Sequence, residues 1–231
     1  MLPRSESLQP ILRPHDAVYR PAGEGRFPVV VLLHGCAGVR RKDTQWAEAF
    51  RQQGYVAIVV DSLSGRGITT REDRIRVCRG LDLWGSTRAG DVLASLTYVR
   101  ALPFVDAERI AVVGWSHGAW AALDFLASAS PEMVRGLRAV VAFYPYCGLV
   151  SRARWRGFGV DVPVLMLLGE ADSIVSTDSC LKLAVAQAEQ GRSVSTKVYR
   201  EVGHVFDWRE TAATLDARER VREFLAGRLK S

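Results

Sequence analysis

The stretch IAVVGWSHGAW, residues 110–120, decides how the rest of the chain is interpreted. Its first half is a nearly continuous apolar run, which is typical of a strand buried on both faces of a sheet. Its second half opens the pattern GAWAALDFLASA, whose apolar positions recur every three or four residues, as in a helix. Between strand and helix lies GWSHG, residues 114–118, which matches the pattern G-x-S-x-G. This context predicts a sharp turn that carries Ser116.

A serine on such a turn is a candidate nucleophile. The turn lifts the hydroxyl of Ser116 out of the sheet, and the glycines two positions before and after it let strand and helix approach closely. The backbone N–H of the next residue, His117, then points at a developing oxyanion, and the positive end of the helix dipole adds to its effect. Adjacent residues on the turn point in different directions, so the His117 ring cannot readily act as the base. We expect that ring to line the mouth of the site or to cap the helix.

Short apolar runs alternate with longer helical patterns along the chain. This alternation predicts an α/β fold with a mostly parallel central sheet and helices on both faces. Chemistry in such sheets lies beyond the carboxyl ends of the strands, on the loops. The expected strands span residues 28–33, 55–60, 109–114, 138–145, 162–169 and 195–200, and the expected helices span residues 42–54, 87–102, 118–129, 178–191 and 209–229.

The base for Ser116 must come from another loop at this edge of the sheet. His204, in EVGHVFDW, follows the last expected strand and is the best candidate. His34 ends the first long strand, where we expect a buried, hydrogen-bonded structural role. His15 lies in an irregular N-terminal segment and is expected at the surface. The sequence therefore predicts His204 as the general base.

An acidic residue should orient that imidazole and stabilise its cation. Asp172 follows the buried run VPVLMLLG and lies at the same edge as the serine. Glu170 and Asp178 are its competitors: the first follows the strand so closely that it can point away, and the second resembles a helix cap. The chain order Ser116, Asp172, His204 is the order found on the α/β-hydrolase scaffold.

A second oxyanion donor is expected from the loop after the first long strand. HGCAG, residues 34–38, has the glycine-rich composition of such a loop. The backbone N–H of Cys36 is the candidate donor, and its thiol is incidental because the sequence places no base beside it. Cys36 and His117 would therefore hold the oxyanion through backbone N–H groups.

Length, composition and charge limit the remaining possibilities. At 231 residues and 48% hydrophobic, the chain can bury one substantial core, so a single domain is expected. The net charge of +6 comes from scattered arginines, and the densest cluster, residues 71–79, is interrupted by two acidic residues. A nucleic-acid partner is therefore not expected.

The sequence also bears on membrane association and on the cysteines. No apolar run reaches the roughly 18 residues of a membrane-spanning helix, and the first 25 residues contain no signal-peptide core. We expect no membrane association and a soluble, cytoplasmic protein. The alternative of an exported form that has lost its signal peptide stays open. The even number of cysteines permits disulfides, and their spacing is not that of a zinc site. They are Cys36, Cys78, Cys147 and Cys180.

These segments resemble the dienelactone hydrolase family, a branch of the α/β-hydrolases. The resemblance extends from about residue 27 to about residue 225. The enzymes that give the family its name carry a cysteine at the elbow, whereas this chain carries Ser116. The resemblance therefore implies a carboxylic ester hydrolase with a serine nucleophile. Further segments similar to the family are DSLSGRG (61–67), YPYCG (144–148) and VGHVFDW (202–208).

The resemblance also implies a domain organisation. We expect one catalytic α/β-hydrolase domain over residues 27–231, without a large cap domain. Residues 1–26 form an N-terminal extension that packs on this core or leads into it. Neither a metal nor an organic cofactor is expected.

The predicted reaction is cleavage of a small carboxylic ester or lactone through an acyl-enzyme on Ser116. The expected partner is thus a small molecule, and the protein is a monomer or a homodimer. Two alternatives stay open: a catalytically silent binding module of the same fold, and a small peptidase. Candidate substrate-binding residues are Arg66, which can meet a carboxylate, and Trp115, Tyr146 and Trp208, which can wall a pocket.

Overall fold

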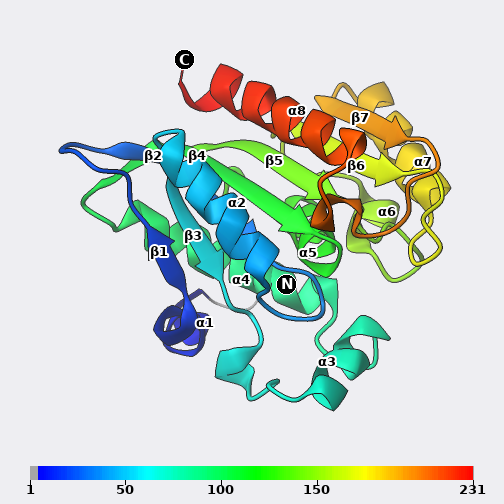
Figure 1. The fold of residues 1–231 in the computed structure, drawn as a ribbon, viewed down its shortest axis with the longest axis horizontal. Coiled ribbons are helices and arrows are strands. Elements are labelled where there is room, and N and C mark those ends of the chain that lie inside the picture. The colour runs from blue at the N-terminus through cyan, green and yellow to red at the C-terminus, as the bar shows by residue number, and fades with distance from the viewer. Residues whose placement is uncertain (1–4, 231) are drawn as a thin grey trace.

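A seven-stranded sheet runs through the centre of the protein (Figure 1). The computed structural model describes residues 5–230. The strands are β1 Ala17–Tyr19, β2 Phe27–Leu33, β3 Val56–Val60, β4 Val105–Trp115, β5 Leu137–Phe143, β6 Val164–Gly169 and β7 Val194–Tyr199. Their order across the sheet is β1-β3-β2-β4-β5-β6-β7; β2 to β7 pair in parallel, and β1 pairs antiparallel with β3. The predicted mostly parallel sheet is confirmed.

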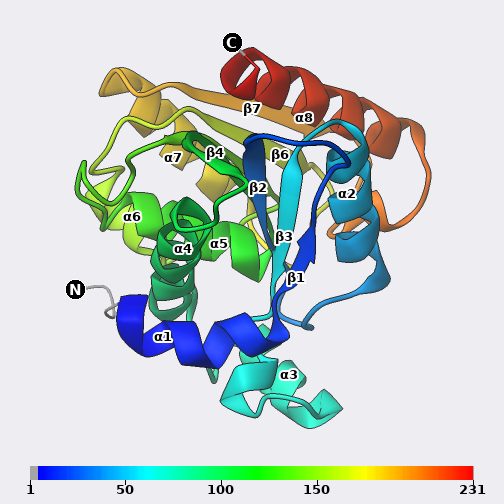
Figure 2. The ribbon, with the colours of Figure 1, turned by 90° about the vertical axis from the view of Figure 1, so that its left-hand side faces the viewer.

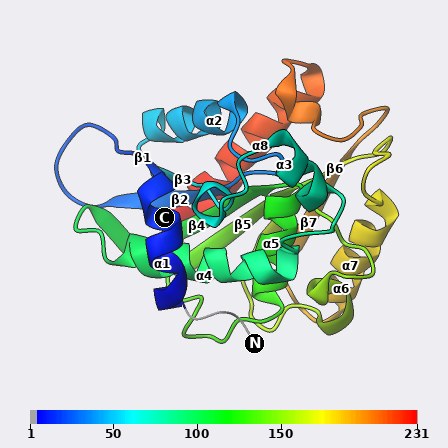
Figure 3. The ribbon, with the colours of Figure 1, turned by 90° about the horizontal axis from the view of Figure 1, so that it is seen from below.

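Helices cover both faces of this sheet, as Figure 3 shows. The helices are α1 Ser5–Leu12, α2 Arg41–Gln52, α3 Arg71–Cys78, α4 Gly85–Arg100, α5 His117–Leu126, α6 Arg152–Arg156, α7 Thr177–Glu189 and α8 Ala212–Leu229. Buried side chains of α2 and α8 form one apolar cluster with one face, and those of α1, α4, α5 and α7 form a second cluster with the other face. Strands β2 and β3 are buried almost throughout because they have helices on both sides.

The N-terminal segment, expected to be irregular, contains a helix and a strand. Figure 2 shows α1 lying against α4, where the side chain of Gln9 donates to the carbonyl oxygen of Ala94 at 2.7 Å. Strand β1 extends the sheet at its β3 edge. Both elements are short and are stabilised by contacts with distant residues, so the local sequence carried little signal for them. His15 is exposed, as predicted.

The segment between β3 and α4 projects beyond the ends of the strands and contains α3 (Figure 2). The sequence did not predict this helix. Val77 is the buried residue of α3, and the other positions show no apolar residues recurring every three or four residues. Thr70 caps α3 by accepting a hydrogen bond from the N–H of Asp73 at 3.2 Å. The segment between β5 and β6 holds only the short helix α6, so no cap domain lies there, as predicted.

All four cysteines form disulfides. Cys36 is bonded to Cys78, and Cys147 is bonded to Cys180. Such pairs are typical of oxidising compartments, whereas the cytoplasmic location stays a prediction. Within residues 5–230, no helix combines the length and the apolar character that crossing a bilayer requires.

Asp16 links the N-terminal segment to the sheet and supplies a test of this packing by pH. Its Oδ1 accepts a hydrogen bond from the N–H of Asp61 at 3.1 Å. Burial raises the pKa of Asp16 to about 7, and the negative charges of Asp61 and Asp91 add to the increase. The folded state therefore favours the protonated carboxyl, and the stability that this protonation contributes is lost as the pH rises from about 4 through about 7.

We expect Asp16→Asn, which cannot ionise, to be more stable than the wild type at pH 8 and close to it at pH 4. Between pH 4 and pH 8, the free energy of unfolding of Asp16→Asn should rise relative to that of the wild type by on the order of 3 kcal/mol. Urea denaturation of both proteins at the two pH values measures it. An equal difference at pH 4 and pH 8 would show that Asp16 titrates alike in the folded and unfolded chain.

Candidate active site

The turn that carries Ser116 joins the end of β4 to the start of α5. Ser116 adopts φ 51° and ψ −111°, a strained conformation that residues other than glycine rarely adopt. A Cβ added at Gly118 would overlap the carbonyl groups of Leu33 and His34, and one at Gly114 would overlap the backbone of α5. Glycine is required at both positions because β4, α5 and the end of β2 meet in backbone contact. The predicted strand-to-helix turn is confirmed.

A chain of hydrogen bonds joins Ser116, His204 and Asp172. Oγ of Ser116 lies 2.9 Å from Nε2 of His204, and Nδ1 of His204 lies 2.7 Å from Oδ2 of Asp172. An ionised carboxylate only accepts hydrogen bonds, so Nδ1 carries the proton and Nε2 accepts from the hydroxyl. The structure thus brings together the three residues that the sequence analysis selected from separate loops.

The environment of Asp172 keeps its carboxylate charged. Its side chain is buried, and Oδ1 accepts hydrogen bonds from the N–H groups of Ile174 at 2.9 Å and Val175 at 3.0 Å. Burial raises the pKa of Asp172, but the hydrogen bonds from His204 and from these two N–H groups outweigh it and leave the pKa below its ordinary value. Asp172 therefore stays ionised at neutral pH.

Neither competing acidic residue forms a hydrogen bond with His204 among the described residues. Glu170 is exposed. Asp178 forms an exposed ion pair with Lys182 at 2.7 Å. The expectation that Asp178 caps α7 is wrong: Ser176 is the capping residue, and its Oγ accepts from the N–H of Ser179 at 3.1 Å. A hydroxyl one residue before the helix can reach that N–H, whereas Asp178 already lies within the first turn.

A buried aspartate fixes the loop that follows His204. Asp207 is 4% exposed and accepts hydrogen bonds from Nε1 of Trp115 at 2.8 Å, from Nε1 of Trp46 at 3.3 Å and from the hydroxyl of Tyr144. The Tyr144 ring also packs edge-on against the imidazole of His204, with 4.7 Å between ring centroids. The sequence analysis missed Asp207, because its partners lie on distant elements.

The loop of residues 34–38 runs beside the candidate nucleophile. A Cβ added at Gly35 would lie 3.8 Å from Cβ of Ser116. Within the part of the chain that the structure describes, no hydrogen bond occupies the backbone N–H of Cys36 or that of His117. Two such N–H groups beside a serine hydroxyl can receive an oxyanion.

Buried polar side chains support this loop from behind. His34 is fully buried, and its Nε2 accepts from the N–H of Ser62 at 3.2 Å, so its predicted structural role is confirmed. The guanidinium of Arg88, also fully buried, donates to the carbonyl oxygen of His34 at 2.7 Å, to Oγ of Ser62 at 2.8 Å and to Nδ1 of His117 at 3.2 Å. Burial and the nearby charge of Arg88 lower the pKa of His117 to about 3, so this ring is neutral.

A cavity of about 520 Å³ opens beside Ser116. The His117 ring lies in its lining, as expected from the sequence, and so does the ring of Tyr146. The lining is mostly apolar, which is typical of a site for a small organic molecule. Its residues are Cys36, Val77, Cys78, Arg79, Gly80, Trp84, Ser116, His117, Trp120, Tyr146, Val150, Ile174, Val175 and His204.

Three of the predicted substrate-binding residues lie outside this cavity, which corrects the prediction. Arg66 pairs with the buried carboxylate of Asp91 at 2.6 Å and donates to the carbonyl oxygen of Ser62 at 2.5 Å, so its charge is already neutralised. Trp115 is fully buried on the other face of the sheet. Trp208, 53% exposed on the short helix Phe206–Trp208, does not line this cavity and instead borders a separate hollow that His204 also lines.

Among residues 5–230, no group of three or more His, Cys, Asp or Glu side chains is arranged to hold a metal ion.

A parallel sheet with a serine on the turn after a central strand, a histidine beyond the last strand and a carboxylate between them defines the α/β-hydrolase class. Within this class, the sequence model of the Dienelactone hydrolase family matches residues 16–228. The chain belongs to that family.

Comparison with individual proteins gives more distant similarities. Quorum-quenching protein AidA of Acinetobacter baumannii is 33% identical over 102 residues, which are 44% of this chain and 31% of that protein. The match thus spans about a third of that relative. Thermogutta terrifontis esterase 2, phosphorylated by paraoxon, superposes with a TM-score of 0.67 at 20% identity and covers 92% of this chain and 88% of its own. Porphyromonas gingivalis dipeptidyl peptidase 4 superposes with a TM-score of 0.69 at 19% identity, over 93% of this chain and 33% of its own.

The contact around Gly118 can be tested by adding one methyl group. We expect Gly118→Ala to lower the free energy of unfolding by about 2 kcal/mol or more, because the Cβ meets backbone carbonyls that cannot move aside. Gly227→Ala is the matched control, since its Cβ has no heavy atom within 4 Å. This control should be neutral or more stable by up to about 1 kcal/mol. Denaturant unfolding of the two variants compares them, and equal stability would remove the argument for close contact.

Proposed function

We propose that the protein hydrolyses small carboxylic esters and lactones through an acyl-enzyme on Ser116. The observation that carries the proposal is the hydrogen-bond chain from Ser116 through His204 to Asp172, which ends at the apolar cavity. Membership of the Dienelactone hydrolase family supports it.

In the first half of the proposed reaction, Oγ of Ser116 bonds to the acyl carbon while Nε2 of His204 takes the hydroxyl proton. The carbonyl electron pair moves onto oxygen and forms an oxyanion. Asp172 holds the imidazolium ring in place and stabilises its charge. When the oxyanion collapses, the alcohol oxygen leaves and takes the proton from His204.

Water completes the cycle through the same groups. His204 takes a proton from water as the water oxygen bonds to the acyl carbon of the acyl-enzyme. Collapse of the second oxyanion breaks the bond to Oγ, which receives the proton back from His204, and releases the carboxylic acid. A lactone follows the same steps and yields a hydroxy acid.

The N–H groups of Cys36 and His117 hold both oxyanions in this mechanism. Each donor contributes on the order of 3 kcal/mol of transition-state stabilisation. The close approach of Gly35 to Ser116 supports the assignment, because it brings the residue 34–38 loop to the serine. The positive end of α5 adds to the stabilisation.

The alternatives differ from this proposal in measurable ways. A silent binding module does not react with a fluorophosphonate, and a peptidase cleaves a dipeptide p-nitroanilide at least as well as an ester. The match of the Dienelactone hydrolase family model to residues 16–228 favours the ester hydrolase over the peptidase.

We expect the wild type to hydrolyse p-nitrophenyl butyrate and to be labelled by a fluorophosphonate probe. Ser116→Ala should abolish labelling, and His204→Ala and Asp172→Asn should lower kcat by about 10³-fold or more. Steady-state kinetics and labelling followed by mass spectrometry measure these effects.

The control is Ser195→Ala, which removes a hydroxyl that donates to the carbonyl oxygen of Val164 at 3.3 Å within the sheet and should leave both readouts unchanged. Labelling that survives Ser116→Ala would reject the nucleophile. Equal turnover by the wild type and His204→Ala would reject the base, and a wild type that never labels would favour the binding module.

A further inference from the structure

Two aromatic rings form one wall of the cavity beside Ser116. The ring centroids of Trp120 and Tyr146 lie 4.8 Å apart at an interplanar angle of 53°, and both rings line the cavity. The ring of His117 packs edge-on against Trp120, with 5.3 Å between centroids. The wall is therefore continuous with the candidate oxyanion site.

The Trp120 ring is held in a single position. Its Nε1 donates to Oδ2 of the buried Asp124 at 2.9 Å. Oδ1 of Asp124 accepts from Oγ of Ser151 at 2.8 Å and from the N–H of Ala153 at 3.0 Å. A Cβ at Gly85 would overlap the indole, so glycine at that position leaves the space that the ring occupies.

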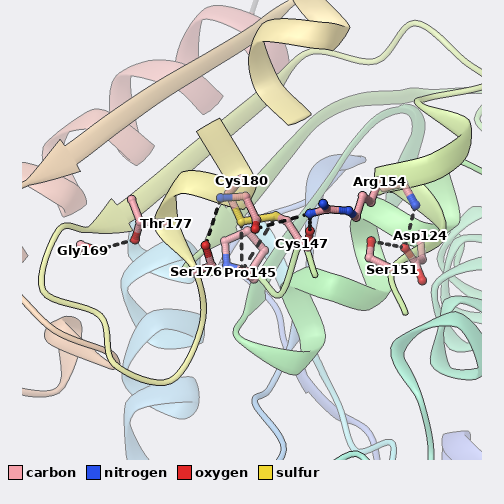
Figure 4. Close-up of a disulfide and its surroundings, with 11 residues drawn as sticks. Asp124, Pro145, Cys147, Ser151, Arg154, Gly169, Ser176, Thr177 and Cys180 are labelled. Atoms are coloured by element: carbon pink, nitrogen blue, oxygen red, sulfur yellow. Dashed lines mark hydrogen bonds between the residues drawn. A yellow bond between two sulfur atoms is a disulfide. The ribbon is translucent and has the colours of Figure 1, made fainter. Parts of the chain in front are cut away.

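The Tyr146 ring is held by its neighbours in the chain. A Cβ at Gly148 would overlap this ring, so the backbone of residue 148 packs directly against it. Cys147, between the two, is bonded to Cys180 on α7, and Figure 4 shows this disulfide near Asp124 and Ser151. Both rings are thus fixed before any ligand arrives, which lowers the entropy cost of binding.

The cavity has little charge to offer a ligand. Arg79 is the one lysine or arginine in its lining, and this side chain is exposed. His117 is neutral because its pKa lies at about 3, and Arg88 lies behind it, outside the lining. Exposed apolar side chains continue the lining at the mouth, with Trp84 45% and Ile174 70% exposed. A carboxylate in this cavity would lose hydration without gaining a buried cation.

On the basis of the proposed function, we infer that the cavity accepts a neutral aryl or branched alkyl acyl group and discriminates against acyl groups that carry a carboxylate. The acyl group stays bonded to Oγ of Ser116 until water releases it, so it must occupy the space that opens beside this atom. The rigid rings of Trp120 and Tyr146 favour flat or branched apolar groups, which bury most of their surface against them.

The test uses two p-nitrophenyl esters of equal shape. The 4-methylpentanoate ends in a branched pair of methyl groups, and the succinate monoester ends in a carboxylate at the same place. We expect kcat/KM for the neutral ester to exceed that for the anionic one by about a hundredfold. Ser116→Ala gives the background rate for each ester, so the absence of any Ser116-dependent turnover reports failure of the proposed function itself.

Variants connect this preference to the wall. A third ester, p-nitrophenyl acetate, has an acyl group too short to reach the wall. Tyr146→Ala should lower kcat/KM for the 4-methylpentanoate, divided by kcat/KM for the acetate, by about tenfold, because the longer acyl group loses an apolar contact. Tyr146→Phe keeps the ring and should keep the ratio. Trp155→Ala, which removes an exposed indole outside the cavity, is the matched control. Equal or faster turnover of the succinate monoester, or an unchanged ratio in Tyr146→Ala, would overturn the inference.

A separate observation concerns Arg88, a cation buried without an acidic hydrogen-bond partner among the described residues. Burial lowers its pKa to about 10, so it keeps its charge at neutral pH. Its acceptors include the carbonyl oxygen of His34 and Nδ1 of His117. His34 is the first residue of the loop that carries Cys36. His117 is the residue whose backbone N–H is the second candidate oxyanion donor.

We propose, again on the basis of the proposed function, that Arg88 is a positioning residue for the oxyanion site. A single guanidinium nitrogen, Nη1, donates to the carbonyl oxygen of His34 and to the ring of His117 at once, so it ties the two halves of that site together. A lysine keeps the charge, but its side chain is one bond shorter, so its ammonium cannot take the place of Nη1.

We expect Arg88→Met to lower kcat by about ten- to a hundredfold and to change KM by less than about twofold, because ground-state binding does not use the oxyanion donors. Arg88→Lys should recover part of kcat. Ser62→Ala is the matched control: it removes the one Arg88 partner that does not belong to the oxyanion site, and it should change kcat by less than about threefold.

The result that would overturn this role is a kcat of Arg88→Met or Arg88→Lys near the wild-type value, or a rise in KM as large as the fall in kcat. If Arg88→Met does not fold, Arg88→Lys and His117→Phe carry the test, since each removes at least one of the two bonds that Nη1 makes. The rate of fluorophosphonate labelling should fall in parallel with kcat. Normal labelling together with a low kcat would also contradict the proposal.

Discussion

Backbone contact between the first turn of α5 and the carboxyl end of β2 is the constraint on which the site depends. The absence of a Cβ at Gly118 lets α5 begin directly against the carbonyl groups of Leu33 and His34. The same contact holds Ser116 in its strained conformation and places the loop after β2 beside it. A wider gap between α5 and the end of β2 would move the hydroxyl of Ser116 away from the N–H of Cys36, because Cys36 lies on the loop that continues β2.

Two buried polar networks hold the site from opposite faces of the sheet. On one face, Arg88 donates to the carbonyl oxygen of His34, at the start of the loop after β2, and to the ring of His117, the first residue of α5. On the other face, Asp207 accepts hydrogen bonds from Trp46, Trp115 and Tyr144 and so fixes the loop that carries His204. Burying such polar groups is unfavourable unless hydrogen bonds replace the lost hydration, so each network stabilises the arrangement in which its bonds form. Nη2 of Arg88 is an exception, because it has no hydrogen-bond partner among the described residues.

The sequence predicted the parts of the site that follow from local rules. Ser116 stands out by its pattern between strand and helix, and the rule that parallel strands end at one edge selected Asp172 and His204. Trp115 was misplaced although local information was available: residues alternate along a strand, and Trp115 shares its face with Val113 in the cluster under α2 and α8.

Other features could not be predicted because they depend on partners far apart in the chain. The pairing of Arg66 with Asp91 and the hydrogen bonds of Asp207 are chosen by the folded arrangement, and no spacing in the sequence indicates them. The same holds for α1 and for the disulfide partners. Both disulfides end at the cavity: Cys36 and Cys78 lie in its lining, and Cys147 follows Tyr146. Each covalent link limits how far the segments it joins can separate, so the disulfides restrict the arrangement of the segments that border the cavity.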